Sequence, residues 1–281
     1  MFKKELTLFL EFLSYFSIDL HQKLCKMQIY FLGTGTSQGI PVIGSHHSVC
    51  FSNNFKDKRL RVSVWIKTEK ASIVIDCGPD FRQQMLTCQC QEVDAILFTH
   101  EHSDHTAGLD DIRPFYFKQG KDIPVFAQKR VLDNLARRFD YIFEKENKYP
   151  GSPSVEVNEI DHNEKFFVNG EEVLPILVHH GNLEILGFRI GDFAYITDAS
   201  AISDNELSKL KNLKVLVINA LREEQHHSHF SLSEALNFIN LVQPEKAFLT
   251  HISHLLGFHD EVEKSLPKNV HLAYDNLVLT I

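Results

Sequence analysis

Short apolar runs, separated by glycine, proline and charged residues, make up most of the chain after residue 26. Their short length and their content of valine, isoleucine and phenylalanine favour β-strands. The runs that predict strands cover residues 28–32, 61–67, 72–76, 93–98, 166–168, 173–178, 186–190, 193–197, 214–219, 246–250 and 270–274. Helices are predicted over residues 78–86, 111–118, 128–139, 203–210, 231–241 and 258–265.

The order of these elements predicts the fold class. In each half of the chain, strands come first and helix–strand units follow, with no repeat of fixed period and no linker between the halves. Such an order is typical of an α/β protein in which helices cover sheets that pack on each other. We therefore expect a four-layer αββα sandwich formed by a single domain over residues 27–281.

The first 26 residues have a different character. Their basic start and apolar run resemble a signal peptide, but Glu11 interrupts the run and no small-residue cleavage site follows. The run is also too short to span a membrane. The apolar positions suit one face of an amphipathic helix, namely Leu8, Phe9, Phe12, Phe16 and Leu20. We expect residues 1–26 to be a helical extension outside the catalytic core.

The net charge and the cysteine count indicate which binding partners and which cellular compartment to expect. The chain of 281 residues has 37 acidic and 29 basic side chains, a formal net charge of −8. This balance disfavours a nucleic acid polymer as the main partner and remains compatible with a small anionic substrate. Five cysteines form an odd set in a chain too large to need disulfides, which predicts reduced thiols and a cytoplasmic location without a membrane partner.

The segment directly after the apolar run at 93–98 contains three histidines and an aspartate within six positions. His100 and His102 are two residues apart, so in an extended chain they point to the same side. Asp104 and His105 follow where the chain turns. Imidazole nitrogen and carboxylate oxygen are ligands of zinc and related divalent ions, and grouping four such side chains without a metal is unfavourable. The segment therefore predicts a site for two metal ions.

Each ion needs further ligands from elsewhere in the chain. Three later residues each follow an apolar strand, namely His180, Asp198 and His251. Ligands at strand ends on one edge of a sheet converge in space. The alternative for each residue alone is a side chain that only satisfies a nearby loop carbonyl.

Together these residues resemble the metallo-β-lactamase superfamily, whose signature is matched by His100-x-His102-x-Asp104-His105. The resemblance covers about residues 27–281. It implies that one ion is bound by His100, His102 and His180. It implies that the other is bound by Asp104, His105 and His251, with Asp198 bridging the two. The choice of His180 over His179 depends on the following Gly181-Asn182-Leu183.

Residues outside the ligand set indicate which branch of the superfamily the chain resembles. A bridging Asp198 is common to phosphodiesterases, nucleases and thioesterases of the superfamily, but not to lactamases. His229, in the histidine-rich segment 226–231, matches a position where the family places a phosphate-facing histidine. Together with Thr250-His251-Ile252-Ser253-His254, the glycine-rich loop at 33–41 resembles the phosphodiesterases that open phosphoribosyl 1,2-cyclic phosphate. No helix follows that loop, which rules out a dinucleotide-binding fingerprint. The loop resembles a phosphate cradle, but we expect a tight turn that lets the first strand's backbone pass beneath the metal site.

The resembling phosphodiesterases also carry a structural zinc held by three cysteines and one histidine. The corresponding positions here are Ser45, His47, Cys50 and His254, and serine is a poor zinc ligand. A third, structural zinc would then use His47, Cys50 and His254, with His46 or a water as fourth ligand. The alternative is that this site has been lost.

The expected function is that of a dinuclear-metal hydrolase, a phosphodiesterase acting on small or cyclic phosphodiesters. Two zinc or manganese ions would share a hydroxide that attacks phosphorus. Asp104 would orient this nucleophile, and His229 would bind the phosphoryl group or protonate the leaving oxygen.

Other functions stay open. A tRNA 3′-processing nuclease would need a basic arm, and segment 118–148 has lysines and arginines but no long glycine-rich insertion. A thioester hydrolase and a non-catalytic metal-binding accessory protein are further alternatives. Apolar residues at 112–117 would line the pocket or a homodimer contact.

Overall fold

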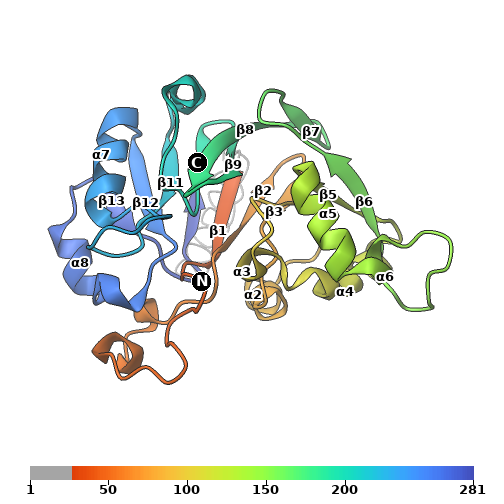
Figure 1. Cartoon of the computed structure of the whole chain (residues 1–281), viewed down its shortest axis with the longest axis horizontal. Coiled ribbons are helices and arrows are strands. Elements are labelled where there is room, and N and C mark those ends of the chain that lie inside the picture. The colour runs from red at the N-terminus through yellow and green to blue at the C-terminus, as the bar shows by residue number, and fades with distance from the viewer. Residues whose placement is uncertain (1–26) are drawn as a thin grey trace, which may run out of the picture.

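The computed structural model describes residues 27–281, so the predicted helix at 1–26 lies outside the described residues. Two β-sheets pack face to face, and helices cover their outer faces (Figure 1). Helices α7 and α8 flank one sheet, and α2, α4 and α5 flank the other. The predicted αββα sandwich is confirmed. No helix among residues 27–281 has the length and apolar character needed to cross a membrane.

The first sheet has seven strands, and it comes mainly from the first half of the chain. Across the sheet they are β14 (Val278–Thr280), β1 (Met27–Gly33), β2 (Ser63–Thr68), β3 (Ser72–Ile75), β4 (Ala95–Leu97), β5 (Ile123–Ala127) and β6 (Val155–Glu159). Pairing is antiparallel from β14 to β3 and parallel from β3 to β6. The carboxyl ends of β3 and β4 therefore lie at the same edge.

The second sheet repeats this arrangement with the second half of the chain. Its strands are, in order, β13 (Val270–Leu272), β12 (Lys246–Thr250), β11 (Val215–Asn219), β10 (Phe193–Tyr195), β9 (Leu183–Ile190), β8 (Glu171–His180) and β7 (Phe166–Val168). Pairing is parallel from β13 to β10 and antiparallel from β10 to β7.

The helices are short and lie on the outer faces or in the connecting loops. The α-helices are α2 (Phe81–Cys88), α3 (Ser103–Thr106), α4 (Arg113–Gln119), α5 (Lys129–Arg138), α6 (Asp140–Phe143), α7 (Leu232–Val242) and α8 (His259–Ser265). The 3-10 helices are η1 (Ser48–Phe51), η2 (Phe55–Asp57), η3 (Leu109–Ile112), η4 (Asp204–Leu210) and η5 (His254–Leu256). Helix α7 begins with a complete capping box between Ser231 and Glu234, which satisfies two free amides at its start.

Three apolar layers hold the sandwich together. The central layer lies between the sheets and contains the fully buried side chains of Phe31, Ile73 and Phe188. A second layer joins the first sheet to its helices, and a third joins the other sheet to α7 and α8. A strand buried on both faces accounts for the continuous apolar runs seen in the sequence, because neither face can be polar.

Three strands were not predicted, namely β5, β6 and β14. Strand β5 contains Pro124, which normally argues against an interior strand. Strands β6 and β14 are sheet edges with exposed residues such as Val157 and Val278, so their burial pattern carries little signal. The predicted helix at 203–210 is the 3-10 helix η4.

A substitution in the central layer tests the packing directly. Replacing Phe188 with alanine removes a fully buried ring between the sheets. We expect the free energy of unfolding to fall by about 3–5 kcal/mol. The control is Phe167→Ala on the nearby strand β7, where the ring is 55% exposed. It should change stability by less than about 0.5 kcal/mol in urea unfolding. Equal losses would show that the layers are wrongly assigned.

Candidate metal centre

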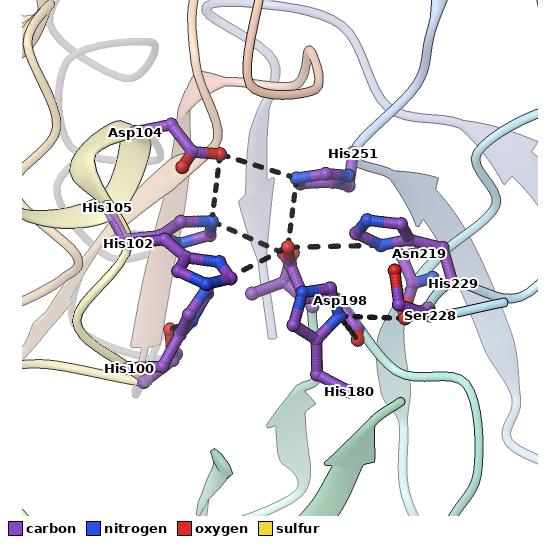
Figure 2. Close-up of polar contacts among 12 residues, drawn as sticks. His100, His102, Asp104, His105, His180, Asp198, Asn219, Ser228, His229 and His251 are labelled. Carbon is purple, nitrogen blue, oxygen red and sulfur yellow. Dashed lines mark hydrogen bonds and ion pairs between the residues drawn. The ribbon is translucent and has the colours of Figure 1, made fainter. Parts of the chain in front are cut away.

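Strand ends from both sheets place the predicted ligands in one group (Figure 2). His100 and His102 follow β4, and Asp104 and His105 lie in the short helix α3. The other three come from the second sheet, with His180 ending β8, Asp198 following β10 and His251 following β12. The structure therefore brings together all seven residues that the sequence singled out.

The ligand atoms form two neighbouring groups. One group contains His100, His102 and His180, and its atoms lie within 4.8 Å of one another. The other contains Asp104, His105, Asp198 and His251 within the same limit.

Asp198 lies between the two groups. Its Oδ2 is 3.2 Å from His251 Nε2 and 4.0 Å from His100 Nε2, and its Oδ1 is 3.3 Å from His105 Nε2. If two ions were bound, one to each group, a carboxylate in this position would be able to contact both.

The chemistry of these atoms fits divalent metal ions. The Nε2 atoms of His100, His105 and His251 are buried, and none has a hydrogen-bond partner among the described residues. Buried polar atoms normally find a partner, so three unpaired nitrogens facing one carboxylate require an explanation. Ions held between the nitrogens and the carboxylates provide one, because each nitrogen then has a ligand bond.

Outer contacts fix the orientation of the ligand rings. His105 Nδ1 lies 2.6 Å from Asp76 Oδ2, and this carboxylate also accepts hydrogen bonds from the amide and hydroxyl of Thr99. The Thr99 hydroxyl is in turn 2.9 Å from His100 Nδ1. A proton on Nδ1 of His105 leaves Nε2 free to bind a metal, so this buried carboxylate orients one ring directly and a second through the hydroxyl.

His180 is oriented by backbone carbonyls. Its Nδ1 lies 2.9 Å from the Asp198 carbonyl and 2.7 Å from the Ser228 carbonyl, so it donates its proton there. Asn219 accepts from the Ala199 amide at 2.7 Å and donates to the Ala199 carbonyl at 2.9 Å. This pair of bonds fixes the chain immediately after Asp198.

The backbone is strained at the site. Asp76, Asp198 and His251 have φ values of 64°, 58° and 54°, in the left-handed region that side chains other than glycine rarely adopt. Such residues cost of order 1–3 kcal/mol each and persist where the surroundings hold them in place. Each of the three residues follows a strand, and the side chains of Asp198 and His251 point toward the centre (Figure 2).

Glycines allow close packing beneath Asp104. A Cβ on Gly78 would lie 2.1 Å from the Asp104 carbonyl oxygen, and one on Gly108 would lie 2.1 Å from the Gly78 carbonyl oxygen.

The glycine-rich loop at 33–41 packs beside the chain that carries His251. Thr36 N donates to Ile252 O, and Ile252 N donates to Thr34 O, both at 3.0 Å. This loop therefore supports the chain beside His251, as expected of a tight turn.

His229 lies at the rim of the two groups. Its Nδ1 is 3.8 Å from Asp198 Oδ2, and it groups with His180 and Asp198 within 4.8 Å. Its side chain is 11% exposed, and Nδ1 has no hydrogen-bond partner among the described residues. Helix α7 begins just after it, and the cap of that helix is Ser231, so His229 itself is free to face the centre.

The predicted structural zinc ligands meet only in part. The rings of His47 and His254 lie 5.1 Å apart, centroid to centroid. The Cys50 sulfur accepts a hydrogen bond from the Val42 amide at 3.5 Å, and no group of three converging ligands forms here among the described residues. The third zinc site stays a prediction.

Comparison with known proteins shows the family. The sequence profile of the Beta-lactamase superfamily domain matches residues 71–252. The crystal structure of a new diphosphatase from the PhnP family is 36% identical, with a TM-score of 0.85, and the match covers 91% of this chain and 97% of that one. The chain belongs to the metallo-β-lactamase superfamily, and within it to the PhnP family.

Two further relatives define the limits of the comparison. An octanoyltransferase of Porphyromonas gingivalis is 40% identical over 253 residues, 89% of this chain and 51% of that protein. The chain thus spans about half the length of this relative. Zinc-bound PqqB from Methylobacterium extorquens has a TM-score of 0.75 at 16% identity, covering 90% and 100% of the two chains. This second likeness shows the fold alone.

Sequence reasoning missed the outer contacts of this superfamily centre. Asp76 was recognised only as the end of a strand, and Asn219 only as part of another. Both follow apolar runs, just as Asp198 and His251 do. A polar residue directly after a buried strand was the available signal, and it applies to orienting residues as well as to ligands.

Electrostatics differ between the two groups. Burial lowers the pKa of His100 well below its usual range, so this ring is neutral. Burial also disfavours the charged form of His105. However, three carboxylates surround that ring, and they raise its pKa well above the usual range. Burial disfavours the charged form of Asp198 too, but His251 and His105 outweigh this effect and hold its pKa well below the usual range.

This difference in pKa between His100 and His105 predicts how many protons are released as each metal ion binds. A metal must displace the proton of His105, whereas His100 is already neutral. Titrating metal-free protein at pH 7 in buffers of different ionisation enthalpy should show one ion binding with release of about one proton more than the other. Affinity for that ion should rise with pH. Equal proton release for both ions would contradict the assignment.

The choice between adjacent histidines has a separate test. His180→Ala should lower the affinity for one ion at least about tenfold. The matched control is His179→Ala, because the His179 backbone contacts Ser200 and Ala201 while its side chain belongs to neither ligand group. Metal content after dialysis should fall only for His180→Ala. A loss confined to His179→Ala would reverse the assignment.

Proposed function

We propose that this protein is a metal-dependent hydrolase of small phosphorus-containing substrates, acting at a phosphorus with two bridging oxygens. Phosphodiesters, including cyclic ones, and diphosphate linkages share such a centre. The observation that carries the proposal is the position of His229. It adds a largely enclosed imidazole, with a buried Nδ1 that has no hydrogen-bond partner among the described residues, beside Asp198, where a phosphoryl group bound at the two ligand groups would meet it.

The proposal assigns a part to each residue. Two divalent ions bound here would lower the pKa of water and take up charge that develops on phosphoryl oxygens. Asp198 holds the two ligand groups together, and His100, His105 and His180 are oriented by their Nδ1 contacts. Asp104 stays ionised because His105 and His251 outweigh its burial and lower its pKa, so it can orient the nucleophile.

His229 would act by contact with the phosphoryl group. Burial, with His251 nearby, lowers the pKa of His229 to about 3 in the protein alone. The ring is therefore neutral before substrate binds and offers an N–H donor. A phosphoryl anion beside it would favour the protonated form, from which a proton can pass to the leaving oxygen.

The PhnP-family diphosphatase supports a phosphorus substrate, because the match extends over almost all of both chains. The octanoyltransferase name belongs to a protein of which this chain matches 51%, so it gives weaker support for acyl chemistry. Among the described cysteines, Cys77 is next to Asp76, and burial raises its pKa well above the usual range. It is a poor thiolate nucleophile, which disfavours acyl transfer at this centre.

The central prediction separates metal binding from catalysis. His229→Ala should keep both ions but lower kcat on bis-p-nitrophenyl phosphate by about 10²–10⁴-fold. Asp198→Asn should lower both activity and metal content. Metal analysis and steady-state kinetics of the same preparations provide the readout. Unchanged turnover in His229→Ala would remove the role assigned to this residue.

A substrate panel tests the reaction class. It should include bis-p-nitrophenyl phosphate, a 2′,3′-cyclic nucleotide, phosphoribosyl cyclic phosphate, a dinucleoside diphosphate, a short RNA and a chromogenic thioester. We expect turnover of the small phosphorus compounds. Activity on the thioester alone would overturn the proposal in favour of a thioester hydrolase, and activity on RNA alone would favour a nuclease.

A further inference from the structure

The loop between β11 and α7 carries a second histidine next to His229. The ring centroids of His226 and His229 lie 5.1 Å apart, and those of His229 and His251 lie 4.8 Å apart. The three imidazoles thus form a row. It begins at the candidate metal ligand His251, continues through His229 and ends at His226. Figure 2 shows the inner part of this row, with His229 beside Asp198 and His251.

The contacts of His226 determine which of its nitrogens carries the proton. Its Nδ1 lies 3.4 Å from the amide nitrogen of Ser228, which donates to it. A backbone amide has no acceptor capacity, so the proton of the neutral ring is on Nε2. Nε2 has no hydrogen-bond partner among residues 27–281 of the structure. The ring therefore offers a free N–H donor just beyond His229.

The loop that carries His226 is held in place. Arg222 donates from its guanidinium to the carbonyls of Glu224 and Gln225, at 3.4 Å and 3.2 Å. Its own carbonyl accepts from Leu232 N at 2.8 Å, at the start of α7. These bonds fix the loop against a capped helix, so the donor of His226 has a defined place and its ordering cost is already met.

His226 differs from its neighbour in exposure. His226 is half-buried, whereas His227 is exposed. The two rings lie 4.3 Å apart, and Arg222 is also close enough to His226 to act on it electrostatically. His226 is therefore the more enclosed of the two rings, and His227 is its exposed neighbour.

We propose that His226 binds a second phosphoryl group next to the one that is attacked, and so makes the site selective for diphosphate linkages over simple phosphodiesters. This inference rests on the proposed function. In a diphosphate the two phosphorus atoms share one bridging oxygen. With the first phosphoryl group at the metal centre and His229, the oxygens of the second reach outward along the row to His226. A hydrogen bond from the ring to an anionic oxygen is stronger than one to a neutral group.

The test compares two substrates with the same nucleoside, P1,P2-di(adenosine-5′) diphosphate and the p-nitrophenyl ester of adenosine 5′-monophosphate. In His226→Ala, kcat/KM should fall at least about tenfold more for the diphosphate than for the ester, since one charge-assisted hydrogen bond is lost. His226→Gln, which keeps an N–H donor, should recover part of the difference. His227→Ala is the matched control and should leave the ratio unchanged.

A binding measurement keeps the inference separate from the proposed function. Metal-loaded protein should bind methylenediphosphonate more tightly than methylphosphonate, and His226→Ala should lose at least about tenfold of this preference. If the wild type hydrolyses neither nucleotide, the proposed function fails while this comparison still decides the role of His226. An equal loss on both ligands, an equal loss on both substrates or no change at all would overturn the inference.

Discussion

The rest of the structure depends on one electrostatic constraint, the buried carboxylate of Asp198 between histidines from opposite sheets. Its oxygens face the unpaired Nε2 atoms of His105 and His251, and His100 lies only slightly farther away. Burying so many polar atoms is unfavourable unless each finds a partner. Divalent cations bound between the two sheets would supply these partners, and the sandwich is the scaffold that presents the strand ends to such a site.

Hydrogen bonds and backbone conformation around Asp198 and the histidines hold these side chains in place. Asp76 orients His105 directly and His100 through Thr99, while the Asp198 and Ser228 carbonyls orient His180. Asp76, Asp198 and His251 have left-handed backbone just after the strands that they follow. Each such residue is costly, and the buried sheets supply the packing that holds it. The packing of the apolar sheets thus holds the strained and polar residues of the candidate metal centre in place.

The sequence predicted which side chains converge, and it did so for a physical reason. The candidate ligands lie at the ends of buried strands or, for Asp104 and His105, in the short helix that follows one, and buried strands are visible as apolar runs even in a single sequence. The same logic predicted the αββα layers. The edge strands β6 and β14 were not predicted because their exposed faces leave no apolar pattern. Strand β5 was not predicted because it contains Pro124, a residue that normally argues against an interior strand.

The orienting contacts could not be predicted in the same way. Whether a polar residue after a strand binds a metal or orients a ligand depends on distances of a few tenths of an ångström, which no spacing encodes. Asp76 and Asn219 have the same sequence context as Asp198. Only the folded chain shows that Asp76 faces His105 Nδ1 and that Asn219 bonds the Ala199 backbone. The donor of His226 is a similar case, since it depends on the bond between Ser228 N and His226 Nδ1.

The role of Asp198 is tested most directly by locating the metals in crystals of the metal-loaded protein by anomalous scattering. Two ions about 3.5–4 Å apart are expected. The Asp198 carboxylate should contact both, with the Nε2 atoms of His100 and His180 on one ion and those of His105 and His251 on the other. A single ion at full occupancy, or an Asp198 carboxylate bound to only one of two ions, would contradict this role.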